Sequence, residues 1–426
     1  MTIKKKTHVL LAIVAMLSLI AAACGSDADG TDAASSTVAS TDSTGTPTED
    51  DPGATDAAAD SSLAPITIGF DSQEEELFSI IEARLAAEAA VAYVNAELGG
   101  VNGRPLELEV CTSGDGPEGS VACAQQFVNN DDISIMITSS FSSNEASEVT
   151  VPAGLPLLAL ANLPDDWQRP TEWINDPGFL GIIQAPVNYA ADEVGAATMA
   201  IICADDPFFL EACDAGVGFA AAAGMETFDV TPAGFEQADF TGVVTASRAA
   251  EADVVLVVID GSQCAALAAS FATLSVESTV LTADTCAIED ALTGGGLDNW
   301  LVFGASGLPV NAASATAEIL EGQRIIEEYG SADAELFGLA GWGAANVLAA
   351  RDALLRAGDD ITRESVNDAL SETQLNLGWY ADISCPGPAE LPGACVSTVF
   401  VLRVTGETME FEAIAPIDFA SFDLAG

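Results

Sequence analysis

The chain has 426 residues, of which 65 are Asp or Glu and only 12 are Lys or Arg, so its formal net charge is −53. All three Lys (residues 4–6) and the only His, His8, lie within the first ten residues, which leaves nine Arg as the only basic side chains of the remaining chain. This composition excludes a His general base, a Ser-His-Asp or Cys-His nucleophile, a His metal site and a Lys Schiff base beyond residue 8. Nucleic acid is disfavoured as a partner, because neutralising its phosphates requires clustered Lys and Arg.

The first 23 residues have the pattern of a secretory signal peptide. A basic head is followed by an apolar run over residues 9–23, broken only by Ser18, that is shorter than the roughly 20 residues of a membrane span. Residues 21–24, Ala-Ala-Ala-Cys, resemble the bacterial lipobox, with Ala21 in place of the usual Leu. We predict a signal peptide over 1–23 and lipidation of Cys24, which would hold the protein at the outer face of the cytoplasmic membrane. The alternative is an ordinary signal peptide with an incidental Cys.

Residues 24–63 form the next distinct segment. They are almost wholly Ser, Thr, Asp, Ala, Gly, Pro and Glu, without an aromatic residue. Such a segment cannot bury enough apolar surface to offset its ordering entropy, so we predict a disordered linker. A flexible chain of this length has an end-to-end distance of roughly 35 Å, enough to hold a folded domain away from a membrane. A spacer without function would have the same composition.

Eight further cysteines follow Cys24. An even number of cysteines in an exported chain predicts disulfides, and pairing between sequence neighbours would close four short loops, although the sequence does not fix the pairing. Zinc ligation requires CxxC-type clusters, which the chain lacks, so we expect no metal and no cofactor. The eight residues are Cys111, Cys123, Cys203, Cys213, Cys264, Cys286, Cys385 and Cys395.

The region after the linker is long enough for two domains and alternates short apolar runs with amphipathic segments. Continuous apolar strands that alternate with helices indicate parallel sheets covered on both faces, and two such sets predict an α/β fold with two doubly wound αβα lobes. Two alternating runs near the end, 396–404 and 409–414, predict a hairpin around Gly406. We predict strands at 66–70, 106–111, 133–138, 155–159, 198–203, 254–259 and 280–283, and helices at 77–98, 120–129, 144–151 and 208–223.

The loops that follow the predicted strands are the places to look for a site, because ligands of open parallel sheets bind at the carboxyl ends of the strands. None of these loops contains GxGxxG, GxxxxGK[ST] or GxSxG. Dinucleotide, nucleotide and esterase functions therefore lack their minimal signatures.

A family resemblance rests on residues 86–108, AAEAAVAYVNAELGGVNGRPLEL. This string resembles the motif of Leu/Ile/Val-type solute-binding proteins of ABC transporters, in which a helix ending in Ile-Asn precedes Gly-Gly-(Ile/Val)-Asn-Gly-Arg; here the pair is Val94-Asn95. Weaker matches follow in order at 120–128, 154–158, 238–244 and 252–258, and the resemblance extends from Pro65 to the C-terminus.

The resemblance implies a fold of the type I periplasmic-binding-protein kind, in which two αβα lobes joined by a hinge of three crossings close on a small solute. On this pattern the first lobe holds residues 64–184 and 310–375. The second lobe holds residues 185–309 and 376–426.

The best site candidate in the first lobe is the serine-rich loop that follows the strand at 133–138. Ser142 and Glu145 have the spacing of a capping box, which predicts a helix start with N–H groups and hydroxyls suited to a carboxylate. In the related family, Ser residues at the positions of Ser142 and Ser143 contact the ligand carboxylate. The alternative is that Ser142 only caps the helix.

A second candidate loop follows the strand at 155–159. Amino-acid-binding relatives commonly have a Ser-Pro-Ala-Thr-like sequence there, in which a backbone group and a Thr hydroxyl bind the ligand. This chain instead has Ala161 and Asn162, whose amide is the remaining polar candidate. The missing hydroxyls disfavour an α-amino-acid ligand.

The second lobe of such proteins often supplies an aromatic residue and an acid that pairs with the ligand ammonium. Phe208 or Phe209 stands where the resemblance implies Tyr-Gly, and Asp260 and Asp284 follow predicted strands. The alternative for each Asp is an ordinary solvated carboxylate. Trp342 matches a family Tyr below the cleft, and we expect it to pack in the core.

These features together predict an extracytoplasmic substrate-binding protein of an ABC importer, active as a monomer, that captures a small polar solute such as an amino acid or amide. Its partners would be the solute, the membrane permease and, through the lipid, the membrane itself. A ligand-sensing receptor component of the same fold is the main alternative. An exported hydrolase would need a carboxylate pair such as Asp260 with Asp284, and no motif supports it.

Overall fold

The structure is a computed structural model that describes residues 58–74, 79–114, 116–160, 164–235 and 237–422. The predicted signal peptide, Cys24 and residues 24–57 of the predicted linker lie outside the described residues. The last linker residues are described and bond to the folded region. Ala59 N donates to Asn95 O at 2.7 Å, and Asp60 N donates to Gly103 O at 2.8 Å.

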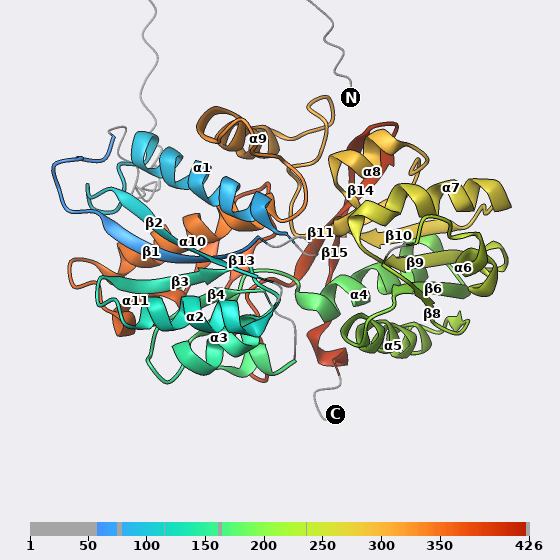
Figure 1. The fold of residues 1–426 in the computed structure, drawn as a ribbon, viewed down its shortest axis with the longest axis horizontal. Helices are drawn as coiled ribbons and strands as arrows, with labels where there is room; N and C mark the ends of the chain where they lie inside the picture. The colour runs from blue at the N-terminus through green and yellow to red at the C-terminus, as the bar shows by residue number, and fades with distance from the viewer. Residues whose placement is uncertain (1–57, 75–78, 115, 161–163, 236, 423–426) are drawn as a thin grey trace, which may run out of the picture. The chain divides into compact units, whose positions relative to one another are not determined.

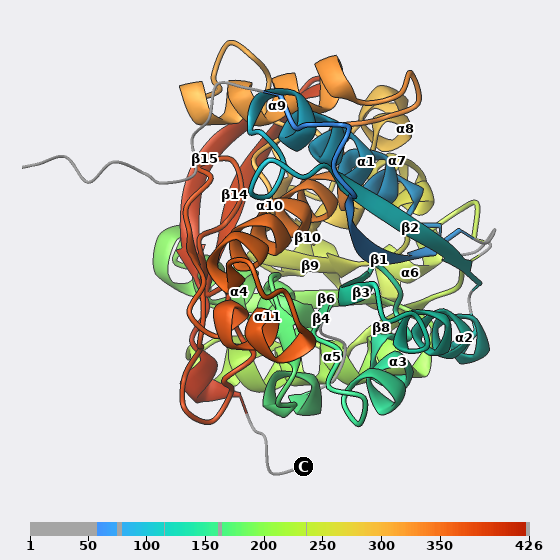
Figure 2. The same cartoon turned by 90° about the vertical axis from the view of Figure 1, so that its left-hand side faces the viewer.

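The first sheet has five parallel strands in the order β2-β1-β3-β4-β5. Helices α1, α10 and α11 cover one face and α2 and α3 the other, while α9 packs on α1 (Figures 1 and 2). The strands are β1 (Ile66–Gln73), β2 (Leu106–Ser113), β3 (Ile133–Thr138), β4 (Leu157–Ala159) and β5 (Glu172–Ile174). The helices are α1 (Ile81–Glu97), α2 (Pro117–Val128), α3 (Ser143–Thr150), α9 (Ala317–Tyr329), α10 (Ala340–Ala357) and α11 (Arg363–Leu370), with a 3-10 turn η1 (Pro164–Gln168).

The second sheet runs in the order β15-β14-β11-β10-β9-β6-β7, with β8 beside β6. Helices α4 and α5 cover one face and α6, α7 and α8 the other (Figure 1). The strands are β6 (Thr198–Ala204), β7 (Glu226–Thr227), β8 (Thr231–Ala233), β9 (Val254–Val258), β10 (Thr279–Ala283), β11 (Leu301–Gly304), β14 (Thr398–Thr405) and β15 (Thr408–Pro416). The helices are α4 (Gly178–Tyr189), α5 (Pro207–Ala222), α6 (Thr241–Ala246), α7 (Cys264–Leu274) and α8 (Glu289–Gly294), with short turns η2 (Ala190–Val194), η3 (Ala249–Glu251), η4 (Gly261–Gln263), η5 (Asp284–Cys286) and η6 (Phe419–Ser421).

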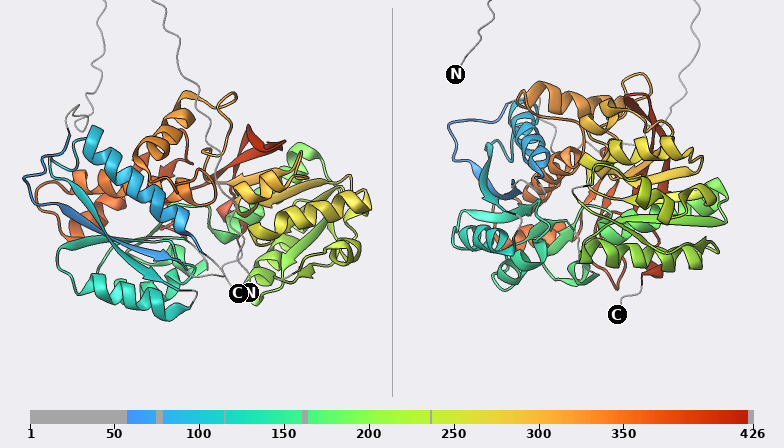
Figure 3. Two further views of the ribbon diagram at one scale, coloured as in Figure 1. Left: turned by 45° about the horizontal axis from the view of Figure 1, so that its top comes forward. Right: turned by 45° about the vertical axis from the view of Figure 1, so that its right-hand side comes forward.

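The chain passes between the two sheet layers three times, which confirms the predicted crossings. These connections lie between β5 and α4, between β11 and α9, and between β13 and β14; the short strands β12 (Gln374–Leu375) and β13 (Ile383–Ser384) pair with each other. Figure 3 shows the strands of both sheets with helices on their faces. The predicted α/β fold with two doubly wound layers is therefore confirmed.

Buried strands and small helix residues explain this packing. Every residue of β3 and β9 is buried, as continuous apolar strands of a covered parallel sheet require. Alanines line the buried face of α1, and α10 approaches it closely at Gly343, where a Cβ atom would lie 1.9 Å from Ala83 O. Only glycine fits at this contact between α1 and α10.

The glycine-rich segment after α1 forms a turn with a structural role. Gly100, Asn102 and Gly103 have φ values of 68°, 52° and 82°, which glycine and asparagine adopt most readily. Asn95 fixes the next strand from two sides: Leu106 N donates to Asn95 Oδ1 at 2.8 Å, and Asn95 Nδ2 donates to Leu106 O at 2.9 Å. The turn thus positions β2 at the edge of the first sheet.

The hairpin and the disulfides also agree with the sequence. Strands β14 and β15 pair antiparallel around Gly406, whose φ is 63°. All four cysteine pairs join sequence neighbours, as Cys111–Cys123, Cys203–Cys213, Cys264–Cys286 and Cys385–Cys395. No cluster of potential metal ligands occurs among the described residues. Within the same residues, no helix has the length and apolar character of a membrane span.

Candidate functional site

A cavity of about 150 Å³ is lined by loops at the carboxyl ends of strands from both sheets. Phe141 and Leu160 follow β3 and β4 of the first sheet, and Asp260 and Asp284 follow β9 and β10 of the second. Ser306, on the connection after β11, also lines the cavity. The position is the one at which open parallel sheets bind ligands.

Aromatic side chains form much of the cavity wall. Phe141, Phe179, Phe209, Trp342 and Tyr380 all line it. The rings of Phe179 and Phe209 meet edge to face with centroids 5.3 Å apart. This wall favours a ligand with an apolar body, and the faces of its rings also attract cations.

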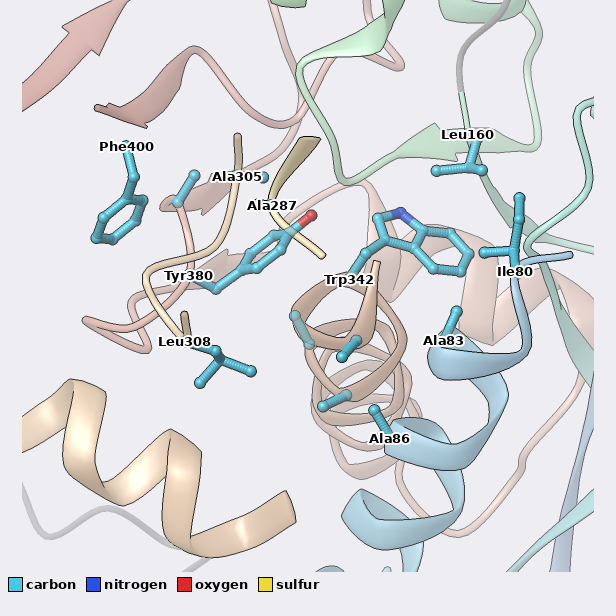
Figure 4. Packing of buried hydrophobic residues seen from close by; sticks show 14 of the residues in the cluster. Ile80, Ala83, Ala86, Leu160, Ala287, Ala305, Leu308, Trp342, Tyr380 and Phe400 are labelled. Carbon is cyan, nitrogen blue, oxygen red and sulfur yellow. The ribbon is translucent and has the colours of Figure 1, made fainter. Parts of the chain in front are cut away.

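Trp342, in the first turn of α10, connects the cavity to the core. Its side chain is only 1% exposed and lies beside Leu160, Ile80 and Ala83 (Figure 4), so the predicted core packing is confirmed. Its indole Nε1 has no hydrogen-bond partner among the described residues. A buried N–H group without a partner costs free energy, so this one is available to a ligand acceptor.

Tyr380 lies between β12 and β13 and is held in place by hydrogen bonds. Its hydroxyl donates to Asn175 O at 2.6 Å, and Asn175 Nδ2 donates to Asn346 Oδ1 of α10 at 3.0 Å. Burial raises the pKa of Tyr380 well above its usual value, and the nearby charges of Asp176 and Asp284 act in the same direction. The hydroxyl is therefore neutral and serves as a hydrogen-bonding group.

Asp284 is an acid of the cavity whose pKa is strongly shifted. Burial raises the pKa of Asp284 to about 7, with a further contribution from the negative charge of Glu82. The carboxylate also lies against the backbone of the neighbouring strand, where a Cβ atom on Gly304 would be 2.6 Å from Asp284 Oδ2. A cation beside Asp284 would stabilise its ionised form.

A second cavity of about 320 Å³ adjoins the first and shares Phe141, Asp260 and Asp284 with it. Glu82 of α1 and Glu335 add two more carboxyl groups to its lining. Burial raises the pKa of Glu82, although Leu339 N donates to Glu82 Oε1 at 3.3 Å and opposes the shift. The two cavities form one continuous acidic region.

No described basic side chain lines either cavity. Six of the nine arginines form ion pairs elsewhere, for example Arg84 with Glu74 and Arg324 with Glu97. The other three, Arg104, Arg351 and Arg363, donate to backbone carbonyls. Asp260, Asp284, Glu82 and Glu335 therefore have no basic partner among the described residues.

The serine loop leads into α3 without the predicted side-chain cap. Ser142 is the residue before α3, but its side chain does not cap the helix, because its backbone (φ −98°, ψ 30°) is not in the extended conformation that capping requires. Ser143 is buried and its Oγ donates to Leu160 O at 2.8 Å. The capping-box prediction is therefore wrong at the side chain, while the predicted helix start is right. Neither serine lines the two cavities.

The other predicted residues divide into two groups. Asp260 and Asp284 lie together at the cavities, as their strand-end positions predicted. Ala161 and Asn162 lie outside the described residues. Phe208 belongs to α5 but its side chain is not described, whereas its neighbour Phe209 lines the cavity.

Sequence reasoning missed Phe179 and Tyr380, which also line the cavity. Phe179 is the second residue of α4, and Tyr380 lies in the segment between β12 and β13. No periodic sequence pattern marks these two residues, and only the folded structure shows that they lie at the cavity.

The arrangement defines a class of protein: two doubly wound layers with a ligand cavity at the strand ends of both. A family model described as "Periplasmic binding protein" matches residues 65–391. The chain belongs to the periplasmic binding protein family and is a solute-binding protein of that family.

Solved structures share the fold. One is a leucine binding protein from Thermotoga maritima (TM-score 0.66, 15% identity, 82% of this chain and 99% of that chain). Another is an ABC transporter solute-binding protein from R. palustris in complex with 4-hydroxybenzoate (TM-score 0.69, 14% identity, 85% and 100%). A third is an ABC transporter substrate-binding protein from Desulfitobacterium hafniense in complex with Leu (TM-score 0.65, 21% identity, 82% and 100%). A comparison with curated proteins finds no match.

Proposed function

We propose that this protein is the extracytoplasmic substrate-binding component of an ABC importer and captures a small solute in the cavity between its two sheet layers. The observation that supports this most is the cavity itself, which draws its lining from strand ends of both sheets. A ligand that contacts both layers favours the state in which they are closed on it. The structurally similar proteins with leucine and 4-hydroxybenzoate bind small solutes on the same fold.

We propose two lobes near the expected boundaries, with residues 64–184 and 310–375 in the first and 185–309 and 376–426 in the second. The chain crosses at 175–177, 305–316 and 385–397, so helix α4 lies with the second lobe. Asp260 and Asp284 of the second lobe, together with Phe209, are our proposed ligand contacts. Both acids lie at the ends of neighbouring strands, β9 and β10, and line both cavities.

The protein would be exported by the signal peptide over 1–23, anchored by lipid on Cys24, and active as a monomer. Metabolic labelling with a radioactive fatty acid tests the anchor, with Cys24→Ala as the unlabelled control. Absence of label on the wild-type protein would remove the anchor from the proposal without affecting solute capture.

The proposed function involves no covalent step. Asp260 and Asp284 form no catalytic motif, and Asp260 already accepts from Ser262 N at 3.0 Å as the cap of η4. Incubation with the bound solute followed by mass spectrometry should return it unchanged. Turnover of the solute would contradict a pure binding role.

Thermal unfolding of the mature protein with a panel of solutes tests the capture function. A ligand at 100 times its dissociation constant should stabilise the protein by about 2.7 kcal/mol. The panel should include amino acids, amides, urea, small carboxylates and small amines, each at millimolar concentration. A panel without any stabilising member would count against solute capture.

A further inference from the structure

We propose that the cavity selects a small organic cation, with an ammonium group on an apolar body and no carboxylate. This inference rests on the proposed function and names the class of solute. It is carried by the charges of the cavity, the chemistry of its wall, and the hydrogen bonds of the loop at which a carboxylate would be expected.

The charges of the lining are all of one sign. Asp260 and Asp284 lie at both cavities, and Glu82 and Glu335 line the adjoining one. All nine arginines are engaged elsewhere, and the chain has no Lys or His after residue 8. A carboxylate entering this region would meet like charges in a partly desolvated site, whereas an ammonium group would meet partners.

The wall also suits a cation with an apolar body. Phe141, Phe179, Phe209, Trp342 and Tyr380 line the cavity, and the negative face of an aromatic ring attracts a cation. Trp342 gives separate evidence for a ligand. Its Nε1 is buried at the cavity without a hydrogen-bond partner among the described residues. That N–H group can donate to a neutral acceptor, such as a hydroxyl, on the same solute.

The first four backbone N–H groups of the serine loop are already paired and are not free for a carboxylate. Ser139 N donates to Asp71 O at 3.0 Å and Ser140 N to Thr138 Oγ1 at 3.3 Å. In the next two residues, Phe141 N donates to Gln73 Oε1 at 3.1 Å and Ser142 N to Ser140 Oγ at 3.0 Å.

Four successive N–H groups of the loop are therefore paired, mostly with acceptors on β1 and β3. An anion placed there would have to break these bonds. Residues 139–142 of the loop at which the family resemblance implies a ligand carboxylate thus offer no unpaired N–H group in this structure.

Two matched series of solutes test the proposal by isothermal titration calorimetry on the full mature chain. The first is isopentylamine, leucine and isovalerate, and the second is phenethylamine, phenylalanine and 3-phenylpropionate. Each series keeps one apolar body and presents the ammonium alone, both charged groups, or the carboxylate alone. We expect the amine of at least one series to bind at least tenfold more tightly than its amino acid, and the carboxylic acids not to bind.

Two variants locate the effect. Asp284→Asn should weaken binding of the amine at least tenfold, and Asp260→Asn provides a second test at the same cavities should Asp284→Asn alter the fold. Asp192→Asn removes the same charge from an exposed position in η2 and should leave the amine affinity unchanged. An equal loss of affinity in the Asp192 variant would mean that net charge, and not the cavity, attracts the amine, and would overturn the proposal.

The outcomes separate this inference from the proposed function. Preferential binding of leucine, phenylalanine, a carboxylic acid or a neutral solute would overturn the cation assignment and leave solute capture intact. Failure of both series and of the whole solute panel would overturn solute capture as well.

Discussion

The Cys264–Cys286 disulfide joins the first residue of α7 to the last residue of η5, with Cα atoms 5.7 Å apart. The two cysteines follow Asp260 and Asp284 closely in the sequence, so the bond ties together the loops that carry both cavity acids. The loops also touch directly, because a Cβ atom on Gly261 would lie 2.2 Å from Thr285 O. The acids of the candidate site are therefore held by a covalent link, in addition to the pairing of β9 with β10.

Replacing Cys264 and Cys286 together by Ser should weaken both folding and binding. Loss of a disulfide that closes a loop of this length costs about 3 kcal/mol, and the released loops should hold Asp260 and Asp284 less firmly. Denaturant unfolding measures the first effect and calorimetric titration of the cognate solute the second. The matched control is Cys111→Ser with Cys123→Ser, which should lower stability to a similar extent and leave affinity unchanged.

Amine affinity should depend on pH through Asp284. Because burial raises the pKa of Asp284 to about 7, a large part of the free protein carries this carboxyl in its neutral form below that pH. A bound ammonium group favours the ionised form, so affinity should rise roughly tenfold between pH 6 and pH 8. Glu82, Asp176, Asp260 and Tyr380 surround Asp284, and Asp284→Asn isolates its contribution by flattening the profile.

The same shift predicts how the ligand-free protein responds to pH. A carboxyl whose pKa is higher in the folded than in the unfolded state binds more protons when folded, so this group's contribution to stability falls as pH rises from about 4 to 7. Asp284→Asn should therefore make the ligand-free protein more stable at pH 8, by roughly 1–3 kcal/mol, and change it little at pH 4. Thermal unfolding at both pH values measures this. Destabilisation at pH 8 would show that the Asp284 carboxylate is structural.

The sequence predicts the repeated elements of this fold well, because continuous burial leaves a clear apolar signal. The predicted strand at 133–138 coincides with β3. Asp260 and Asp284 were predicted to follow strands of one sheet, and both line the cavity. The predicted positions of the helix ends were less accurate. The long helix expected from residue 77 begins at Ile81 in the structure.

What the sequence could not supply are relations between distant segments. Tyr380 reaches the cavity from the segment between β12 and β13 and is positioned through Asn175, a residue about two hundred positions earlier. The sequence predicts a carboxylate site at the serine loop, because it shows the hydroxyl and N–H groups of the loop but not their hydrogen-bond partners. Their partners Asp71 and Gln73 lie on β1, and only the pairing of β1 with β3 brings them together.

A buried charge cluster away from the cavity predicts a second kind of pH dependence. Arg169 Nη1 lies 2.6 Å from Asp166 Oδ1 and 3.0 Å from Glu172 Oε2, and both carboxylates are fully buried. Arg169→Met should destabilise the protein by about 3–5 kcal/mol at pH 8, because two buried acids then lose their cation.

The loss should be smaller at pH 5. Burial and the charge of Asp166 raise the pKa of Glu172 to about 7, so Glu172 is already mostly neutral there. Denaturant unfolding at the two pH values measures the difference, and an equal loss at both would contradict this account. Arg248→Met, at the exposed pair with Glu251, is the control and should change stability little at either pH.

Two glycines in helices should respond to alanine in opposite directions. Gly343 of α10 has no room for a side chain, since a Cβ atom would lie 1.9 Å from Ala83 O of α1. Gly343→Ala must push the two helices apart, and overpacking of this kind costs about 1–3 kcal/mol. Gly218 of α5 faces open space, so Gly218→Ala should stabilise the protein by about 0.5–1 kcal/mol through the lower backbone entropy of the unfolded chain. Denaturant unfolding measures the change in the free energy of unfolding of each variant. Stabilisation by Gly343→Ala would disprove the close approach of α1 and α10.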